Sequence, residues 1–251
     1  MTIDDAQIRE ALKQQFLTDK LLGTGGLPIV LPERRNRAIT PQPNADTEDK
    51  AQRLRRLDEE RVKTCTNCEL AQTRTQTVFG QGCASARLVF VGEAPGFEED
   101  RRGETFVGRA GQLLTKMILA MGLSREEVFI CNVLKCRPPG NRDPLADEIL
   151  ACNAYLVEQL SIIQPEVLIA LGAPAAKTLL NTTQSIGRLR GQFHEYHLSG
   201  TAGVGPAIPL MPTYHPAYLL RSPGEKRKTW ADLQMVMALL GLELPAKTKD
   251  G

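Results

Sequence analysis

The sequence predicts an α/β fold of three layers, α/β/α, around a central, mainly parallel four-stranded sheet. Short apolar segments with the length of buried strands alternate along the chain with longer helical segments. This alternation is typical of parallel sheets, because a helix usually connects one parallel strand to the next. The chain has 251 residues, of which 42% are hydrophobic, and this is enough for one good core.

The expected elements follow one another in a regular order. The four strands are Leu88–Val91, Val128–Leu134, Val167–Leu171 and Ile208–Thr213. The helices that cover them are Ala110–Met121, Leu145–Ile163, Ala173–Leu180 and Glu225–Leu240. A charged helix over Thr47–Val62 precedes the first strand. We expect helices on both faces of the sheet, since a parallel sheet is buried on both faces.

The ends of the chain differ from its middle in composition. Residues 21–48 are rich in Gly, Pro, Asn and Thr, so we expect residues 1–46 to be a poorly ordered extension. Its weak helical pattern at residues 3–19 could dock on an unknown protein. Residues 47–243 form the expected domain, and residues 244–251 form a tail. No apolar run approaches the roughly 20 residues of a membrane span, and no signal pattern or heptad is present. We therefore expect a cytoplasmic monomer without a membrane partner.

Charge alone neither favours nor excludes nucleic acid, because the net charge is only +2. Basic residues nevertheless gather in local clusters. These are Arg101 with Arg102 and Arg109; Lys135, Arg137 and Arg142; Arg188 and Arg190; and Arg221 with Lys226, Arg227 and Lys228. Any one such cluster is typical of an ordinary solvated face.

Polar and turn-forming residues follow each of the four predicted strands. They are Gly92–Gly96, Asn132–Arg137, Gly172–Pro174 and Tyr214–Arg221. Because the carboxyl ends of parallel strands lie at one edge of a sheet, these residues are expected to meet there. Ligands bind at that edge in open α/β sheets, so the sequence predicts a site.

Four of the six cysteines indicate a metal centre. Cys65 and Cys68 have the two-residue spacing that lets two thiolates bind one centre, and Cys136 with Cys152 is the natural second pair. Disulfides are unexpected in a chain without a secretion signal. Thiolates from dispersed elements suit an iron-sulfur cluster at least as well as zinc, and their spacing does not choose between the two. Cys131 is expected in the core.

With these features together, the chain resembles the family 4 uracil-DNA glycosylases, the iron-sulfur type of bacteria and archaea. The motifs that carry the resemblance are Gly92–Gly96 with Glu98–Asp100, Phe106–Leu114, Asn132–Asp143 and His215–Arg221. The resemblance extends from about Val62 to Leu242. It implies an enzyme that flips deoxyuridine out of DNA and hydrolyses its N-glycosidic bond, which leaves an abasic site. It also implies a 4Fe-4S cluster on Cys65, Cys68, Cys136 and Cys152, with zinc as the lesser alternative.

The resemblance further implies the roles of residues in a uracil pocket. Phe106 stacks on the base, Asn132 reads its Watson-Crick edge and His215 donates to O2 as a neutral imidazole. The strand end, at Gly92, Glu93 and Ala94, contributes to the same pocket.

Two positions depart from the best-studied family of uracil-DNA glycosylases. Ala94 stands where that family has an Asp that positions water, so Glu93 is the nearest substitute and Glu99 the second. Gly96 stands where that family has an aromatic residue that excludes thymine. Glu99 is the candidate for that steric role.

DNA contacts are expected from two further loops. Leu219, or its neighbour Leu220, fills the gap left by the extruded base, while Arg221 meets a phosphate. Gly172 begins a helix whose N–H groups point to another phosphate.

Two alternatives remain open. A related clade captures uracil-DNA covalently, but it carries Gln at the position of Ala94 and a basic insertion containing His, whereas Arg137–Asp143 is short and has none. The second is a non-catalytic, metal-stapled DNA-binding module or polymerase accessory. In that case Asn132 and His215 would be dispensable, and DNA binding would be indifferent to uracil.

Overall fold

The computed structural model describes residues 45–243. The predictions for the N-terminal extension and the C-terminal tail fall almost entirely outside the described residues. None of the helices within 45–243 is both long and apolar enough to cross a membrane.

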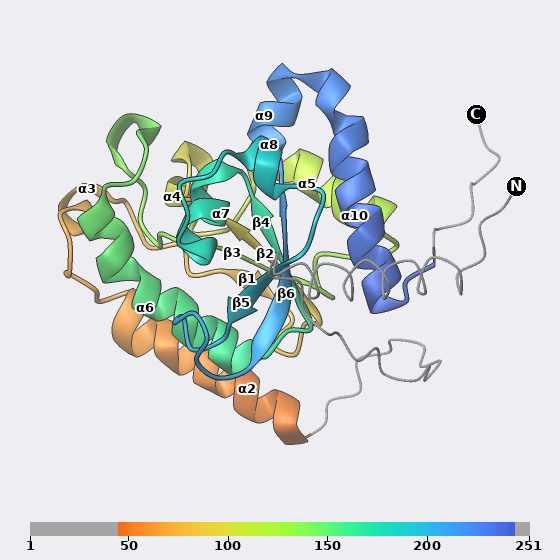
Figure 1. Cartoon of the computed structure of the whole chain (residues 1–251). Coiled ribbons are helices and arrows are strands. Elements are labelled where there is room, and N and C mark those ends of the chain that lie inside the picture. Colours follow the sequence, from red (N-terminus) through yellow and green to blue (C-terminus); the bar gives the residue numbers. More distant parts are fainter. Residues whose placement is uncertain (1–44, 244–251) are drawn as a thin grey trace, which may run out of the picture.

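The core of the fold is a single sheet of six strands in the order β1-β3-β2-β4-β6-β5 (Figure 1). The four central strands are parallel, and they are β2 (Leu88–Gly92), β3 (Phe129–Asn132), β4 (Val167–Leu171) and β6 (Ala207–Thr213). The edge strands β1 (Gln81–Gly82) and β5 (His194–His197) are antiparallel to their neighbours. The predicted α/β class is thus confirmed, but the number of four strands is wrong.

The hydrophobic pattern of the sequence does not predict the two edge strands, because few of their residues are buried. β1 is only two residues long and polar, so it has no apolar period. In β5 only Tyr196 is buried, and its neighbours are partly exposed or exposed. Edge strands are commonly short and polar, because this prevents pairing with other chains.

Helices cover both faces of the sheet (Figure 1). One face carries α2 (Ala45–Leu57), α6 (Ala146–Ile163), α7 (Ala173–Leu180) and α8 (Ile186–Leu189). The other carries α5 (Arg109–Ala120), α9 (Pro216–Arg221) and α10 (Lys226–Leu240). Shorter elements are the π-helical turn η1 (Asp58–Val62), α3 (Leu70–Thr73), α4 (Phe97–Arg102), η2 (Pro139–Asn141) and η3 (Pro223–Glu225).

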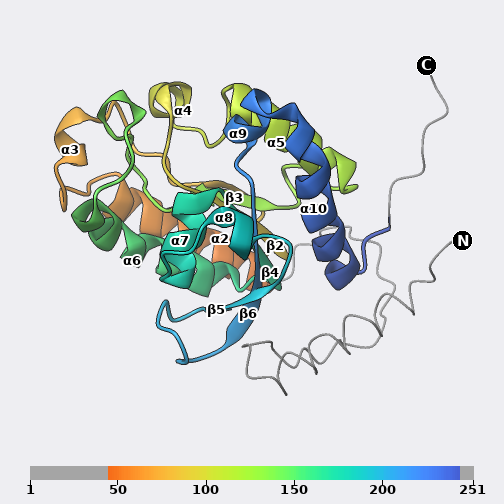
Figure 2. The ribbon, with the colours of Figure 1, turned by 45° about the horizontal axis from the view of Figure 1, so that its top comes forward.

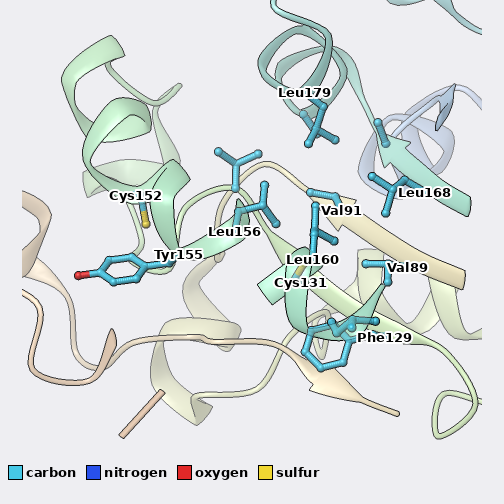
Figure 3. Close-up of a cluster of buried hydrophobic side chains, with 14 of the residues drawn as sticks. Val89, Val91, Phe129, Cys131, Cys152, Tyr155, Leu156, Leu160, Leu168 and Leu179 are labelled. Atoms are coloured by element: carbon cyan, nitrogen blue, oxygen red, sulfur yellow. The ribbon is translucent and has the colours of Figure 1, made fainter. Parts of the chain in front are cut away.

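The strand β2 shows why the central strands read as unbroken apolar runs. Leu88 and Phe90 point into the core on the α5 side, while Val89 and Val91 point into the core on the α6 side. Figure 3 shows the second of these clusters, where side chains from β2, α6 and α7 gather. Burying each such side chain contributes about 1.5–3 kcal/mol relative to exposure, so both faces stabilise the sheet.

The carboxyl ends of the central strands form one edge of the sheet. The pairing of β2 and β3 continues past the strands, because Val133 N donates to Gly92 O (2.9 Å) and Leu134 N to Glu93 O (3.0 Å). The chain segments after these strands therefore leave the edge side by side. Figure 2 shows α4, α5 and α9 along this side of the molecule.

Candidate active site

Three closely packed residues, Gly92, Phe106 and Asn132, lie at the carboxyl ends of β2 and β3. A Cβ atom added to Gly92 would lie 2.3 Å from Asn132 Oδ1 and 2.7 Å from Phe106 Cζ. Both distances are shorter than real Cβ contacts, so only glycine permits this approach. The sequence prediction that Gly92, Phe106 and Asn132 lie together is consistent with this geometry.

The Asn132 side chain is buried without being satisfied. The residue is 1% exposed, and its Oδ1 atom has no hydrogen-bond partner among the described residues. Its backbone oxygen accepts a bond of 2.8 Å from Lys135 Nζ, so the main chain is held in place. An unsatisfied buried acceptor costs about 1–3 kcal/mol, and such a group in a native fold needs an explanation. A ligand that donates a hydrogen bond supplies one.

Phe106 is held in a strained conformation beside Asn132. Its φ is 51°, in the left-handed region that costs a residue of this kind about 1–3 kcal/mol. Arg125 donates to the backbone oxygens of Thr105 (2.8 Å) and Phe106 (3.4 Å), which fixes the loop. The Phe106 ring centroid lies 5.7 Å from that of His215, so these two predicted site residues are brought together.

His215 is the N-cap of α9 and has a defined tautomer. Its Nδ1 accepts a bond of 3.1 Å from Ala217 N, so in the neutral ring the proton is on Nε2. Burial lowers the pKa of His215 to about 4, with a smaller contribution from Arg221 that the charge of Glu99 opposes. The imidazole is therefore neutral at pH 7 and can donate one hydrogen bond through Nε2.

The two candidate carboxylates occupy different environments. Burial raises the pKa of Glu93 to about 7, and Asp143 adds to this effect. Glu99 instead holds the backbone after Phe106 in place, because its Oε1 accepts hydrogen bonds of 3.0 Å from both Val107 N and Gly108 N. Its Oε2 faces Gly96, where an added Cβ would lie 2.7 Å away. Glu93 can therefore exchange a proton near neutral pH, whereas Glu99 braces the Phe106 loop and fills the space beside Gly96.

Leu219, which is predicted to fill the gap left by an extruded base, lies inside the fold. Leu219 is 1% exposed and packs in the core on the α10 side, whereas Leu220 is 37% exposed. On the short helix α9 the two neighbours point in different directions, so only Leu220 faces outward. Arg221 is exposed, as a phosphate contact requires.

Gly172 precedes α7, as predicted, but its own amide already has a backbone partner. Its φ is 91°, and its N–H donates to Thr213 O (2.8 Å), so this amide is not available to a phosphate. An added Cβ would lie 3.0 Å from His215 Cβ. Gly172 thus lets β4 approach the loop that carries His215, and only the first turn of α7 has N–H groups left for an anion.

The four predicted metal-binding cysteines line one pocket. Cys65 and Cys68 precede α3, Cys136 follows β3, and Cys152 is on α6, where Figure 3 shows it near Tyr155. Two of the sulfur atoms accept hydrogen bonds of 3.2 Å, from Arg74 Nη1 to Cys136 and from Lys135 N to Cys152. N–H bonds to sulfur are a feature of protein sites that hold iron-sulfur clusters.

Burial also changes the ionisation of these thiols. Burial raises the pKa of Cys152 to about 11 and raises that of Cys136, so without a cation both are thiols at neutral pH. Among the described residues, no three His, Cys, Asp or Glu side chains form a group suited to a single metal ion. Cys131 is buried in the core, as predicted.

The sequence did not reveal that several residues of the predicted basic clusters form hydrogen bonds or ion pairs within the fold. Lys135 is 1% exposed, and its Nζ donates to Asn132 O (2.8 Å) and Gln159 Oε1 (2.5 Å). Arg142 pairs with Glu148, and Arg190 pairs with the buried Asp232. No local pattern marks these partners, because each lies on another element of the fold.

Comparisons with known proteins agree with this architecture. The model of the uracil DNA glycosylase superfamily matches residues 79–234. A type-4 uracil-DNA glycosylase of Thermotoga maritima is 46% identical over 170 residues, which are 67% of this chain and 84% of that relative.

Two further relatives are similar to this chain. A type-4 uracil-DNA glycosylase of Archaeoglobus fulgidus is 42% identical over 188 residues, 73% of this chain and 92% of the relative. A type-5 uracil-DNA glycosylase of Pyrobaculum aerophilum is 31% identical over 153 residues, 55% of this chain and 64% of the relative. The chain therefore belongs to the uracil-DNA glycosylase superfamily and, within it, to the type-4 branch.

Proposed function

We propose that this protein is a monofunctional uracil-DNA glycosylase that hydrolyses the N-glycosidic bond of deoxyuridine in DNA. The observation that carries the proposal is the buried Asn132 Oδ1, which has no partner among the described residues and lies against Gly92 and Phe106. An extruded uracil supplies the missing donor. Extrusion costs a few kcal/mol and is easiest at a mispair, so binding of the base in the pocket must offset this cost.

Recognition of the base follows from the Asn132 amide. Its Oδ1 accepts from uracil N3–H and its NH₂ group donates to O4, while the Phe106 ring stacks on the base. Cytosine presents the opposite donor and acceptor, so its binding leaves buried groups unpaired. Rejection of that kind reaches roughly 10⁴-fold.

His215 stabilises the leaving group. Cleavage places negative charge on uracil, and the neutral ring of His215 donates from Nε2 to O2. Loss of one such donor costs about 10²- to 10³-fold in rate. The low pKa of His215 supports this role, because the proton needed for donation is present without a net charge.

Glu93 is the better candidate for the carboxylate that orients water and stabilises the sugar cation. A pKa near 7 suits a general base at neutral pH. Glu99 is already engaged by two backbone N–H groups, so it fits the exclusion of the thymine methyl beside Gly96. Ala94 lines the same strand end without a chemical group of its own.

DNA contacts are assigned to the exposed side of α9. Leu220 takes the place predicted for Leu219 and fills the gap in the stack, and Arg221 binds a phosphate. The substrate is uracil-containing DNA. A monomeric state, a cytoplasmic location and a protein contact by residues 1–46 stay predictions.

The residues of the cysteine pocket fit a 4Fe-4S cluster better than zinc. Cys65, Cys68, Cys136 and Cys152 would hold it, with Arg74 and the Lys135 amide as donors to sulfur. A cluster on these cysteines would join the segment before α3 to β3 and α6, and it would stabilise the fold without a step in the hydrolysis.

The test is incubation with an end-labelled oligonucleotide that contains one uracil, thymine or cytosine, followed by alkali. We expect strand scission only at uracil, and its loss in Asn132→Ala. DNA binding that is independent of uracil, with no scission, would favour the polymerase accessory module. A labelled species at the mass of the protein would indicate covalent capture.

A further inference from the structure

An exposed aromatic ring stands beside the candidate pocket. Phe97 is the first residue of α4 and is 56% exposed. The Arg137 guanidinium lies 5.1 Å from its ring centroid, and Arg137 Nε donates to Asn141 Oδ1 (2.7 Å). Exposed aromatic rings are the surfaces on which proteins that bind single-stranded nucleic acid stack the bases, and here a guanidinium lies against the ring.

The topology places this pair on the two chain segments that leave the candidate site. β2 and β3 are neighbours, and their pairing continues to Glu93 and Leu134. Phe97 follows Gly92 by five residues, Arg137 follows Asn132 by five residues, and the two side chains meet.

A second exposed apolar side chain follows another of the central strands. Leu220 follows β6, which is two strands from β2 in the sheet. Two strand spacings are about 10 Å, roughly the length of three stacked nucleotides. A DNA strand that crosses this edge can therefore contact Leu220 and Phe97 with nucleotides of one short segment.

The charge of Arg137 is available to such a strand. Arg101 and Arg102 on α4 pair with Glu98, and Arg142 pairs with Glu148. Within residues 45–243, no carboxylate forms an ion pair with Arg137, whose side chain contacts the neutral Asn141 amide and the Phe97 ring. A phosphate is the anion that DNA offers at this position.

We propose that Phe97 and Arg137 form a second nucleotide subsite, which stacks an unpaired base next to the extruded uridine and binds its phosphate. This inference rests on the proposed function for the identity of the neighbouring nucleotide. Loss of one base–aromatic stack weakens binding by roughly 5- to 100-fold. A base within a duplex is already stacked, so the subsite acts mainly on single-stranded DNA.

The first experiment compares KM and kcat of Phe97→Ala on single-stranded and duplex uracil DNA. We expect KM to rise about tenfold on the single strand and less than about twofold on the duplex, with kcat unchanged. Phe97→Tyr should retain the wild-type KM. Leu119→Ala is the matched control, because Leu119 is 57% exposed in the last turn of α5, at the opposite edge of the sheet. An effect of Phe97→Ala no larger than that of Leu119→Ala would overturn the proposal.

The second experiment does not depend on uracil release. The chain has one tryptophan, Trp230, so Phe97→Trp adds a reporter that a stacked base should quench when oligothymidine is titrated. Arg137→Gln in this background should lower the slope of log affinity against log salt by about 0.7. Quenching without uracil release by the wild type would contradict the proposed function alone. Uracil release without quenching would contradict the subsite alone.

Discussion

Asn132→Leu should raise the stability of the protein while it abolishes uracil release. Asn132 is 1% exposed, and its side chain makes no hydrogen bond among the described residues, so a leucine of similar shape loses no bond there. It removes an unsatisfied acceptor that costs about 1–3 kcal/mol. For a domain of this size, 1 kcal/mol corresponds to about 2–4 °C in Tm. We therefore expect Tm to rise by roughly 2–12 °C, and kcat/KM to fall by about 10³-fold or more.

Gln159→Leu provides the matched control, because Gln159 is a buried amide with both ends satisfied. Its Oε1 accepts from Lys135 Nζ (2.5 Å) and its Nε2 donates to Phe79 O (3.0 Å). Leucine at this position leaves a buried ammonium and a buried carbonyl short of a partner. The free energy of unfolding should fall by at least about 2 kcal/mol.

Thermal unfolding by circular dichroism, at one scan rate and with equal cluster content, measures both variants. The two substitutions of a buried amide by leucine should change Tm in opposite directions. A fall in Tm for Asn132→Leu, like that expected for Gln159→Leu, would refute this expectation. That result would mean that the Asn132 amide supports the fold and is not kept for a ligand.

Four other outcomes are expected. Gly92→Ala places a Cβ 2.3 Å from the amide oxygen of Asn132, so uracil binding measured by inhibition should be lost with the cluster spectrum unchanged. Because burial raises the pKa of Glu93 to about 7, its ionised form increases through that value, and the pH profile of kcat/KM should rise from about pH 6 to 8. Glu93→Gln should remove this rise. In the wild type, the protonated Glu93 carboxyl contributes its full stability below the pKa of Glu93 in the unfolded chain, and this contribution is lost as the pH rises through 7. Urea titrations at pH 5 and 8 can detect the loss. Cys136→Ala should yield colourless protein that folds poorly, and a well-folded, active and colourless product would contradict the structural role of the cluster. Leu219→Ala should lower the free energy of unfolding by about 2–5 kcal/mol, whereas Leu220→Ala should leave it unchanged and raise KM for duplex DNA.

The class of the fold and the site at the carboxyl edge were predictable from the sequence. Leu88–Val91 and Val167–Leu171 are apolar on both faces, and this pattern is typical of strands in a parallel sheet that helices cover on both sides. The two-residue spacing of Cys65 and Cys68 likewise depends on covalent distance along the chain. Such signals are local, so they survive without knowledge of the tertiary structure.

The remaining features depended on which elements meet. β1 and β5 are strands because they pair with β3 and β6, although their own residues are mostly polar. Lys135 read as part of a basic surface, but its ammonium is buried between Asn132 and Gln159.

The outward direction of Leu220, and not Leu219, depended in the same way on the packing of α9 beside α5. The sequence by itself therefore determined the class of fold, the cysteine set and the motifs of the site. Only the tertiary structure decided which charges are paired, which of Leu219 and Leu220 is exposed and which buried atom lacks a partner. The physical reason is that periodicity reports burial within one element, whereas pairing and exposure are set by contacts between elements distant in sequence.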